Sequence, residues 1–199
     1  MHTINDDQDE YIDISFKNTE LRATEINAKE FDNCTFTGCN FSDSAFINCK
    51  FYECKFVNCN LSMVSVLRCS FFDVAFEDSK LIGINWTKAS WPRIKLSSPF
   101  RFDKCILNND SFYGLGLKEI AIVECKAKDV DFRECDCTEA NFTHTDFENS
   151  LFGKTNLTKA DFSEAANYNI DIFNNVIKNA KFSMPEVINL LNSLEIEIN

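Results

Sequence analysis

Large apolar residues recur at every fifth position over most of the chain. One run of these positions extends from Phe16 to Leu96, and a second extends from Phe102 to Phe182. Of the 34 positions, 33 are apolar and only Asn167 is polar, and 17 of the 20 Phe residues lie on them. Because 45% of all residues are hydrophobic, chance alone gives about half, so the period of five is a structural signal.

A second row of small residues lies two positions before each apolar centre. Nine of the ten cysteines occupy this row, and the tenth, Cys137, is itself a centre. A period of five fits neither a helix nor a simple strand, so each unit is expected to be one short extended side and one corner, with two side chains inward and three outward. The pattern predicts a solenoid in which successive coils pair their backbones at about 4.8 Å.

The pattern divides the chain into three parts. Residues 1–13 form an acidic N-terminal segment or cap, and residues 14–183 form the repeat, with a one-residue insertion near 97–101. In residues 184–199 we expect a short helix, because Ser183 and Glu186 have the spacing of a capping box, and then a strand, because Leu194 to Ile198 alternates with period two. Since an open solenoid end exposes hydrogen-bonding edges, this tail is interpreted as a cap or a dimer contact.

Composition and charge narrow the classes of function. No apolar run reaches 18 residues and the N-terminus is acidic rather than basic, so we expect a cytoplasmic protein whose cysteines pack in the core instead of forming disulfides. The net charge of −11 argues against direct binding to nucleic acid or to an anionic membrane, and favours a basic partner. No cofactor motif is present.

The repeat unit resembles the pentapeptide-repeat family. Its consensus of Ala or Cys, Asp or Asn, Leu or Phe and two variable residues matches Cys39 to Asp43, Ala140 to His144 and Ala160 to Glu164. The resemblance covers about Ile14 to Ser183. It implies an all-β fold, a right-handed quadrilateral β-helix with four pentapeptides per coil, so that the 34 repeats make a rod roughly 40 Å long at the strand spacing given above.

The apolar tail resembles that of one subgroup, the Qnr-type quinolone-resistance proteins and the related microcin-immunity protein. In these proteins a comparable segment joins two rods end to end, which implies a homodimer here with the following candidate contacts: Val187, Leu190, Leu191, Leu194, Ile196 and Ile198. They shield DNA gyrase or topoisomerase IV from poisons, usually by mimicry of duplex DNA, and the resemblance implies the same partner. Gram-negative members also carry two outward loops, whereas this sequence is read as leaving room for a one-residue bulge.

Acidic residues crowd one part of the repeat, where Arg133 is the one opposing base. We predict that this acidic coil contacts the partner: Asp129, Asp131, Glu134, Asp136, Glu139, Asp146 and Glu148. An ordinary solvated face is the alternative, because outward positions must be polar in any case. Likewise, a general protein-interaction scaffold with an unrelated partner is the alternative to a topoisomerase-binding protein.

Neither catalysis nor metal binding is expected. Cys135 and Cys137 are both inward positions of the repeat, and the histidines lie outside the spacing of a zinc finger, so they do not form a zinc-binding pattern. A nucleophilic cysteine needs a neighbouring base, and His144 is the one histidine within the repeats, at an outward corner. The sequence therefore predicts a binding surface and not an enzyme.

Overall fold

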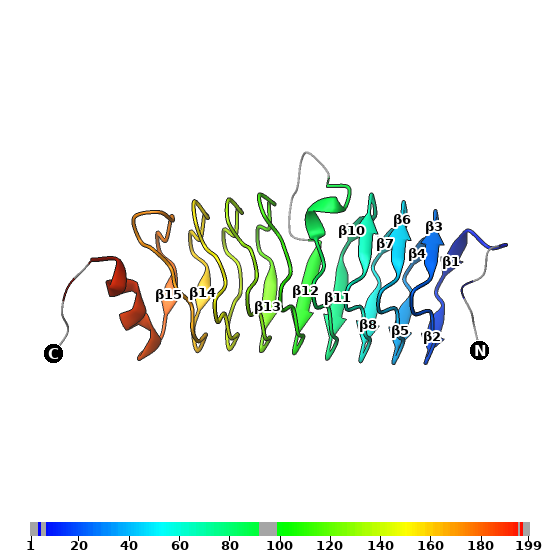
Figure 1. Ribbon diagram of the computed structural model, residues 1–199, viewed down its shortest axis with the longest axis horizontal. Coiled ribbons are helices and arrows are strands. Elements are labelled where there is room, and N and C mark those ends of the chain that lie inside the picture. Colours follow the sequence, from blue (N-terminus) through cyan, green and yellow to red (C-terminus); the bar gives the residue numbers. More distant parts are fainter. Residues whose placement is uncertain (1–3, 5–6, 92–98, 195, 197–199) are drawn as a thin grey trace.

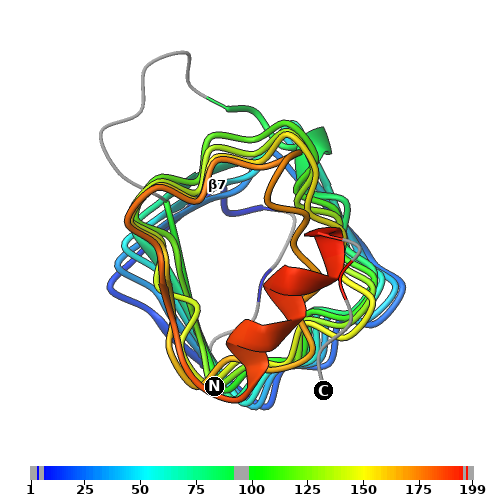
Figure 2. The same ribbon diagram turned by 90° about the vertical axis from the view of Figure 1, so that its left-hand side faces the viewer.

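A computed structural model describes residues 4, 7–91, 99–194 and 196, and it is the right-handed, four-sided β-solenoid that the sequence predicts. Figure 1 shows the coils stacked along one axis, with the two ends of the chain at opposite ends of the rod. Figure 2 looks along this axis and shows the square outline of the coils. In the described part of the chain, no helix is long and apolar enough to cross a membrane.

Two sides of the solenoid carry most of the regular strands, and all of them pair in parallel. The first side is the sheet β1-β4-β7-β10, with bounds Glu10–Ile12, Glu30–Asp32, Lys50–Tyr52 and Ser70–Phe72. The second side is the sheet β2-β5-β8-β11-β12-β13, with bounds Ser15–Lys17, Thr35–Thr37, Lys55–Val57, Val74–Glu77, Phe100–Asp103 and Ala121–Val123. Further along this side β14 (Asp161–Phe162) pairs with β15 (Lys181–Phe182).

The other two sides are built from shorter pairings. The fourth side begins as the sheet β3-β6-β9, with bounds Glu25–Asn27, Ala45–Ile47 and Ser65–Leu67. The third side consists of single parallel bridges, such as Asn40 with Asn60 and Lys126 with Asp146. The corners explain how so short a unit turns, because the residue two after most centres adopts a positive φ, from 47° at Asp73 to 78° at Gly83.

The pairing register corrects the predicted insertion. Successive coils are offset by 20 residues, as in the pair Phe36 and Phe56, but Phe76 pairs with Phe102. That coil therefore holds six extra residues and not the single residue that the sequence suggested. The predicted length of the insertion was wrong because the period of five places Leu96 one coil after Phe76, whereas the register pairs Phe76 with Phe102. Leu96 itself lies within 92–98, outside the described residues.

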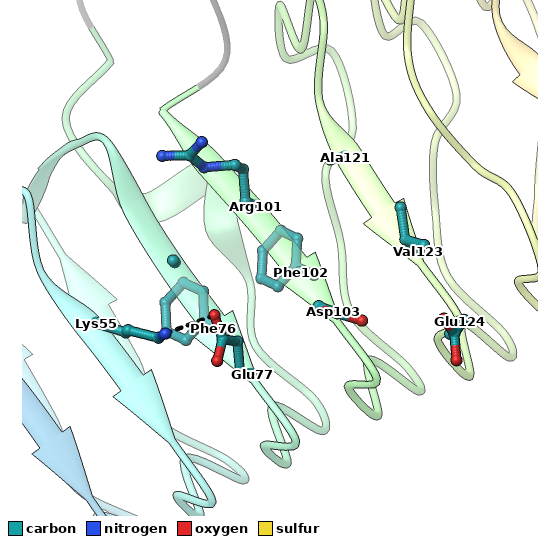
Figure 3. A pocket seen from close by; sticks show the side chains of 10 residues that line it. Lys55, Phe76, Glu77, Arg101, Phe102, Asp103, Ala121, Val123 and Glu124 are labelled. Carbon is teal, nitrogen blue, oxygen red and sulfur yellow. Dashed lines mark ion pairs between the residues drawn. The ribbon is translucent and has the colours of Figure 1, made fainter.

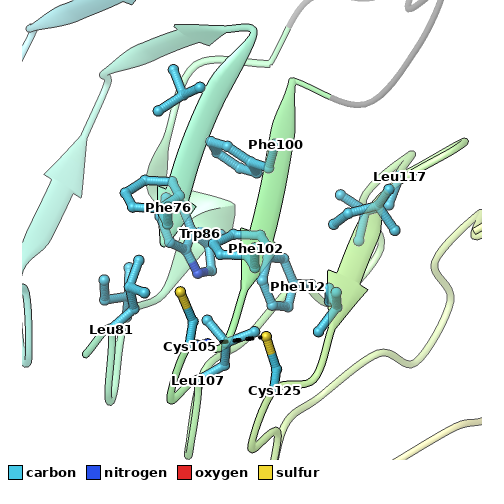
Figure 4. Close-up of a cluster of buried hydrophobic side chains, with 14 of the residues drawn as sticks. Phe76, Leu81, Trp86, Phe100, Phe102, Cys105, Leu107, Phe112, Leu117 and Cys125 are labelled. Carbon is cyan, nitrogen blue, oxygen red and sulfur yellow. Dashed lines mark hydrogen bonds between the residues drawn. The ribbon is translucent and has the colours of Figure 1, made fainter. Parts of the chain in front are cut away.

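Aromatic columns fill the interior. On the second side the rings of Phe36 and Phe56 stack at a centroid distance of 4.5 Å, and those of Phe76 and Phe102 stack at 5.1 Å. Figure 4 shows how Trp86 joins the columns of neighbouring sides in the middle of the rod. Each large ring removed from water contributes roughly 1.5–3 kcal/mol, which is why a chain with so little regular strand is held together.

The second inward row is selected for hydrogen bonding as well as for size. The thiols of Cys34 and Cys49 donate to backbone carbonyl oxygens of the preceding coil, each at 3.2 Å. In the other direction, the Oγ of Ser79 accepts the backbone N–H of Cys59 at 2.9 Å. Because these buried backbone groups need partners, Cys, Ser and Thr satisfy them where alanine cannot.

The N-terminal end differs from the prediction. The solenoid begins with β1 and not at residue 14, because Tyr11 is buried and its ring stacks on Phe31 at 5.2 Å. Tyr11 lies five residues before Phe16, so it is one further repeat centre within the segment predicted to be an acidic cap.

The C-terminal end is closed by the predicted helix. This helix, η2 (Glu186–Leu194), lies across the open end of the last coil in Figure 2 and buries Leu190. Its first residues do not form the expected capping box: the Ser183 Oγ accepts the N–H of Glu164 at 3.1 Å, so it satisfies the solenoid edge instead. The strand predicted after Leu194 lies almost wholly outside the described residues, with Ile196 the exception.

The polar interruption at Asn167 also has a structural reason. Asn167 turns outward with a φ of 58°, and its side-chain amide donates to Asp146 at 2.8 Å. Tyr168 takes the core position instead, with its ring 5.5 Å from those of Phe162 and Phe182.

Candidate functional site

The predicted acidic coil does not form one surface. Its seven residues lie on three of the four sides and on two successive coils. Asp136 belongs to the first side, Asp131 to the fourth, and Asp146 and Glu148 to the third. The other three lie at the corners that follow the third, fourth and first sides: Asp129, Glu134 and Glu139. The sequence brought them together because they are close along the chain, whereas neighbours on a solenoid surface are one coil apart.

Ion pairs neutralise most of this group. Arg133 donates to both carboxylate oxygens of Asp131, at 2.9 and 2.8 Å, and these hydrogen bonds lower the pKa of Asp131. Lys128 contacts both Asp146 and Glu148. Lys154 and Lys159 pair with Glu134 and Glu139 in the same way. Five of the seven carboxylates therefore already have a basic partner within the chain.

A denser acidic surface lies on the first side, in the N-terminal half of the rod. The outward positions of β1, β4, β7 and β10 and of the corners after them carry six carboxylates and one lysine, Lys50: Glu10, Asp13, Glu30, Asp32, Glu53 and Asp73. We call these six residues the acidic side. The strand register places Glu10 beside Glu30 and Asp32 beside Tyr52.

Few bases oppose the acidic side. Lys50 pairs with Glu30 at 3.0 Å, and Arg101 pairs with Asp73 at 2.5 Å. The remaining four carboxylates have no ion-pair partner among the described residues. Like charges on adjacent strands destabilise a sheet, so this arrangement costs folding stability that an alternation of charge would not. Such a cost is typical of a surface shaped by binding.

The acidic side was missed because the sequence was read at a period of five. A period of 20 finds it, since Glu10 and Glu30 are one coil apart, and so are Glu53 and Asp73. The four pentapeptides per coil that the family resemblance implies give this period of 20 residues. Sorting the outward residues by this period reveals the acidic side.

An outward row of the first side is also unusually apolar. Ile12, Asp32, Tyr52 and Phe72 follow one another in register across the four strands. Ile12 and Phe72 are 58% and 59% exposed. The row therefore places apolar and aromatic groups among the carboxylates of the acidic side.

A depression of about 510 Å³ lies on the second side, where Ala75 and Ala121 leave space between longer side chains. Figure 3 shows Lys55 paired with Glu77 at one edge, at 2.7 Å, and Arg101 and Asp103 further along. The depression holds no cysteine, serine or histidine to act as a nucleophile or base. Across the described residues, no three His, Cys, Asp or Glu side chains converge as metal ligands.

The thiols lie inside the solenoid. All ten cysteines are free and buried. Hydrogen bonds between thiols of neighbouring coils raise the pKa of one member of a pair and lower that of the other: the pKa rises at Cys54 and Cys59, and it falls at their partners Cys34 and Cys39. His144 lies exposed at a corner, with a φ of 57°. The arrangement therefore offers outward surfaces for binding and no assembled group for acid–base or nucleophilic chemistry in the described part of the chain.

The predicted dimer contacts fall into two groups. Val187 and Leu190 face the solenoid end, where they pack against the core. Leu191, Leu194 and Ile196 are exposed, at 36%, 38% and 56%. Ile198 lies outside the described residues.

Comparison with known proteins identifies the repeat. The family pattern described as "Pentapeptide repeat region" matches residues 29–99 and 90–162. No curated protein sequence matches the chain. Among solved structures, HetL, a pentapeptide repeat protein involved in heterocyst differentiation regulation in the cyanobacterium Nostoc sp. strain PCC 7120, is 14% identical with a TM-score of 0.61, over 89% of this chain and 90% of that one.

QnrB1, a plasmid-mediated fluoroquinolone resistance protein, is also similar. Two trypsin-treated forms of it are 17% and 16% identical to this chain, with TM-scores of 0.54 and 0.55. Each comparison covers 96% of this chain, and 97% and 99% of those chains. At these identities the likeness is one of fold, and the family pattern carries the relationship.

Proposed function

The chain belongs to the pentapeptide repeat family, and we propose that it is a non-enzymatic, cytoplasmic binding protein that contacts DNA gyrase or topoisomerase IV through the acidic side. In this proposal the acidic side imitates one strand of duplex DNA. By occupying the DNA-binding surface of the enzyme, the protein protects it from quinolones or peptide poisons.

The spacing of charge on the acidic side carries the proposal. Its six carboxylates and Lys50 give a net charge of −5 over four strands. Three strand spacings cover roughly 14 Å, which is about one net charge per 3 Å. Each strand of B-DNA carries one charge per about 3.4 Å. If Arg101 is counted against Asp73, the net charge becomes −4, or about one per 3.5 Å, which stays close to the DNA value.

The corrected insertion bears on the same proposal. Gram-negative Qnr proteins use outward loops, and a one-residue bulge leaves no room for one. Six extra residues between Trp91 and Phe102 do leave room for a segment outside the regular coil. The departure from that subgroup is thus smaller than the sequence suggested.

Gyrase supercoiling across a ciprofloxacin titration tests the proposal. We expect the wild-type chain to preserve supercoiling at drug concentrations that stop the control. An Asp32→Asn, Glu53→Gln variant should lose this effect, whereas a matched Asp129→Asn, Asp136→Asn variant in the predicted acidic coil should keep it. Loss of protection in the second variant alone would place the contact on the acidic coil after all, and no effect of the wild-type chain would refute the proposal.

We also propose that two copies join end to end through the exposed face of η2. Leu191 and Leu194 are exposed there while Leu190 is committed to the core, so the helix has one face for capping and one for association. A homodimer of this kind doubles the length of acidic rod offered to a two-fold symmetric enzyme.

A scaffold with an unrelated partner is the second candidate. It is favoured by the likeness to HetL, which has the higher TM-score, 0.61, and whose described role is in differentiation. Capture of proteins from a host lysate on the immobilised chain separates the two: enrichment of gyrase or topoisomerase IV supports the first, and an acidic-side-dependent partner without them supports the second.

A further inference from the structure

The aromatic row on the first side is the feature of the acidic side that DNA lacks. Tyr52 and Phe72 are neighbours in register on β7 and β10, and the ring of Phe72 is 59% exposed. Corner carboxylates follow each of them directly, Glu53 after Tyr52 and Asp73 after Phe72. A phosphate backbone offers charge without such rings, so the row adds a second kind of recognition.

The chain itself contains an example of what this combination binds. On the fourth side, the guanidinium carbon of Arg133 lies 5.7 Å from the centre of the Tyr113 ring, and the same group donates two hydrogen bonds to Asp131. An aromatic ring and a carboxylate one coil apart thus hold an arginine between them. Arginine suits such a position better than lysine, because its planar group can stack on a ring while it donates to a carboxylate.

We propose that the first side recognises an arginine-bearing segment of a protein partner, with guanidinium groups lying on Tyr52 and Phe72 and pairing with the neighbouring carboxylates. Asp73 already accepts a guanidinium from Arg101, which shows that the corner carboxylates can be reached by one. This inference rests on the proposed use of the first side as a binding surface, but it does not require that the partner be a topoisomerase.

The net charge of the first side selects this occupant over others. The acidic side has a net charge of −5, or −4 when Arg101 is counted, so it repels nucleic acid and anionic lipid. An uncharged apolar segment would leave most of the carboxylates without ionic partners. An extended or helical segment with arginine supplies positive charge and covers the rings at the same time.

Two fluorescein-labelled peptides test the inference, one of alternating arginine and glycine and one in which lysine replaces each arginine. Their affinities for the full chain are measured by fluorescence anisotropy at low ionic strength, where exposed charges are least screened. Stacking on the exposed ring of Phe72 and the half-buried ring of Tyr52 should make the arginine peptide bind about five-fold more tightly than the lysine peptide. Equal affinity of the two peptides for the wild-type chain would overturn the inference.

Variants locate the effect. Tyr52→Leu with Phe72→Leu keeps the charge and the apolar character of the row, and should reduce the ratio of the two affinities to about one. Tyr113→Leu, the matched control on the fourth side, should leave the ratio unchanged. Asp32→Asn with Glu53→Gln should weaken both peptides. A ratio that survives the loss of Tyr52 and Phe72, or affinities that do not respond to the two acid substitutions, would show that the peptides bind elsewhere.

The peptide-binding experiment and the gyrase assay test different proposals, so either can fail while the other succeeds. If the chain discriminates arginine from lysine through Tyr52 and Phe72 but does not protect supercoiling, the topoisomerase proposal fails and the inferred recognition stands. If it protects supercoiling without discriminating the peptides, the acidic side acts by charge alone and the inference is wrong. Circular dichroism and thermal melting of each variant establish that the solenoid is intact.

Discussion

Replacement of Asp110 by asparagine should change how the stability of the protein depends on pH. Asp110 occupies the second inward row, where Cys, Ser, Thr or Ala is usual, and it is 1% exposed. One carboxylate oxygen accepts the backbone N–H of Ile84 at 2.7 Å, and the other accepts the indole N–H of Trp86 at 2.9 Å. Burial raises the pKa of Asp110 well above its usual value, although these two hydrogen bonds act in the opposite direction.

The sign of the effect follows from proton binding. Because the pKa of Asp110 is higher in the folded chain than in the unfolded one, the folded state binds more protons between the two values, and stability falls as the pH rises through that window. The loss is about 1.4 kcal/mol per pH unit. Asparagine cannot ionise and so lacks this slope, but its amide nitrogen faces one of the two N–H donors, which costs about 1–3 kcal/mol.

We therefore expect the wild-type chain to be more stable than Asp110→Asn near pH 4, and the order to reverse within about one to two pH units above it. Urea unfolding at a series of pH values, followed by circular dichroism, gives the two free energies of unfolding. All other carboxylates are shared, so their titration cancels in the difference. Asp78→Asn, at an exposed corner, is the matched control for the loss of one carboxylate. A difference between the wild-type chain and Asp110→Asn that does not change with pH would refute the reasoning.

Three further predictions concern the core, the tail and the thiols. Phe51→Ala should lower the free energy of unfolding by about 3–5 kcal/mol in urea titrations, because the ring stacks on neighbours at 5.1 and 5.3 Å; a change below about 1 kcal/mol would contradict the register. Leu191→Asp with Leu194→Asp should give a monomer of unchanged melting temperature by size-exclusion chromatography with light scattering, whereas Leu190→Asp should destabilise the cap; a double variant that remains dimeric places the interface elsewhere. Cys59 and the other thiols should react with Ellman's reagent only after unfolding, and rapid reaction of the native protein would contradict the packing.

The core and the fold class were predictable because they depend on the repeat alone. A large residue at every fifth position requires that each unit contribute one inward centre, and stacking of identical units then determines the architecture. Phe51 could thus be assigned to the interior without knowing which coil covers it. The helix η2 was predictable for a different reason, because the spacing of its apolar residues is a local feature of the sequence.

The ends of the solenoid and the length of its insertion were harder to predict, because they depend on pairing between coils. Tyr11 is a repeat centre by spacing, but it stands next to an acidic segment that looks like a cap. The period of five places Leu96 one coil after Phe76, whereas the register pairs Phe76 with Phe102. Local spacing cannot distinguish a core residue from an apolar residue in an insertion, because the distinction depends on which residues pair with the neighbouring coil.

The surface was the least predictable part, and the reason is geometric. Interior residues follow a period of five, but surface neighbours follow a period of 20 that becomes 26 at the insertion. Glu10 and Glu30 are adjacent on the rod, while Asp129 and Asp136, closer in sequence, lie on different sides. A binding face of a solenoid is therefore recognised by sorting outward residues into rows, and clusters along the chain mislead.

The buried acid and the insertion have a common physical basis. The six extra residues follow η1 (Trp86–Lys88), and at that point Trp91 donates its indole N–H to the carbonyl oxygen of Trp86 at 2.8 Å, while the Trp86 indole N–H is accepted by Asp110 in the next coil. The stability of a solenoid is approximately a sum over neighbouring coils, so an insertion is tolerated if the coils on both sides of it stay connected. Asp110 makes this connection across the insertion, because its side chain reaches both the backbone N–H of Ile84 and the indole N–H of Trp86 in the preceding coil. The side chain of Cys or Ser at that position is too short to reach both. The unfavourable burial of the Asp110 carboxyl group is therefore offset by the hydrogen bonds that keep the coils in register where the repeat is interrupted.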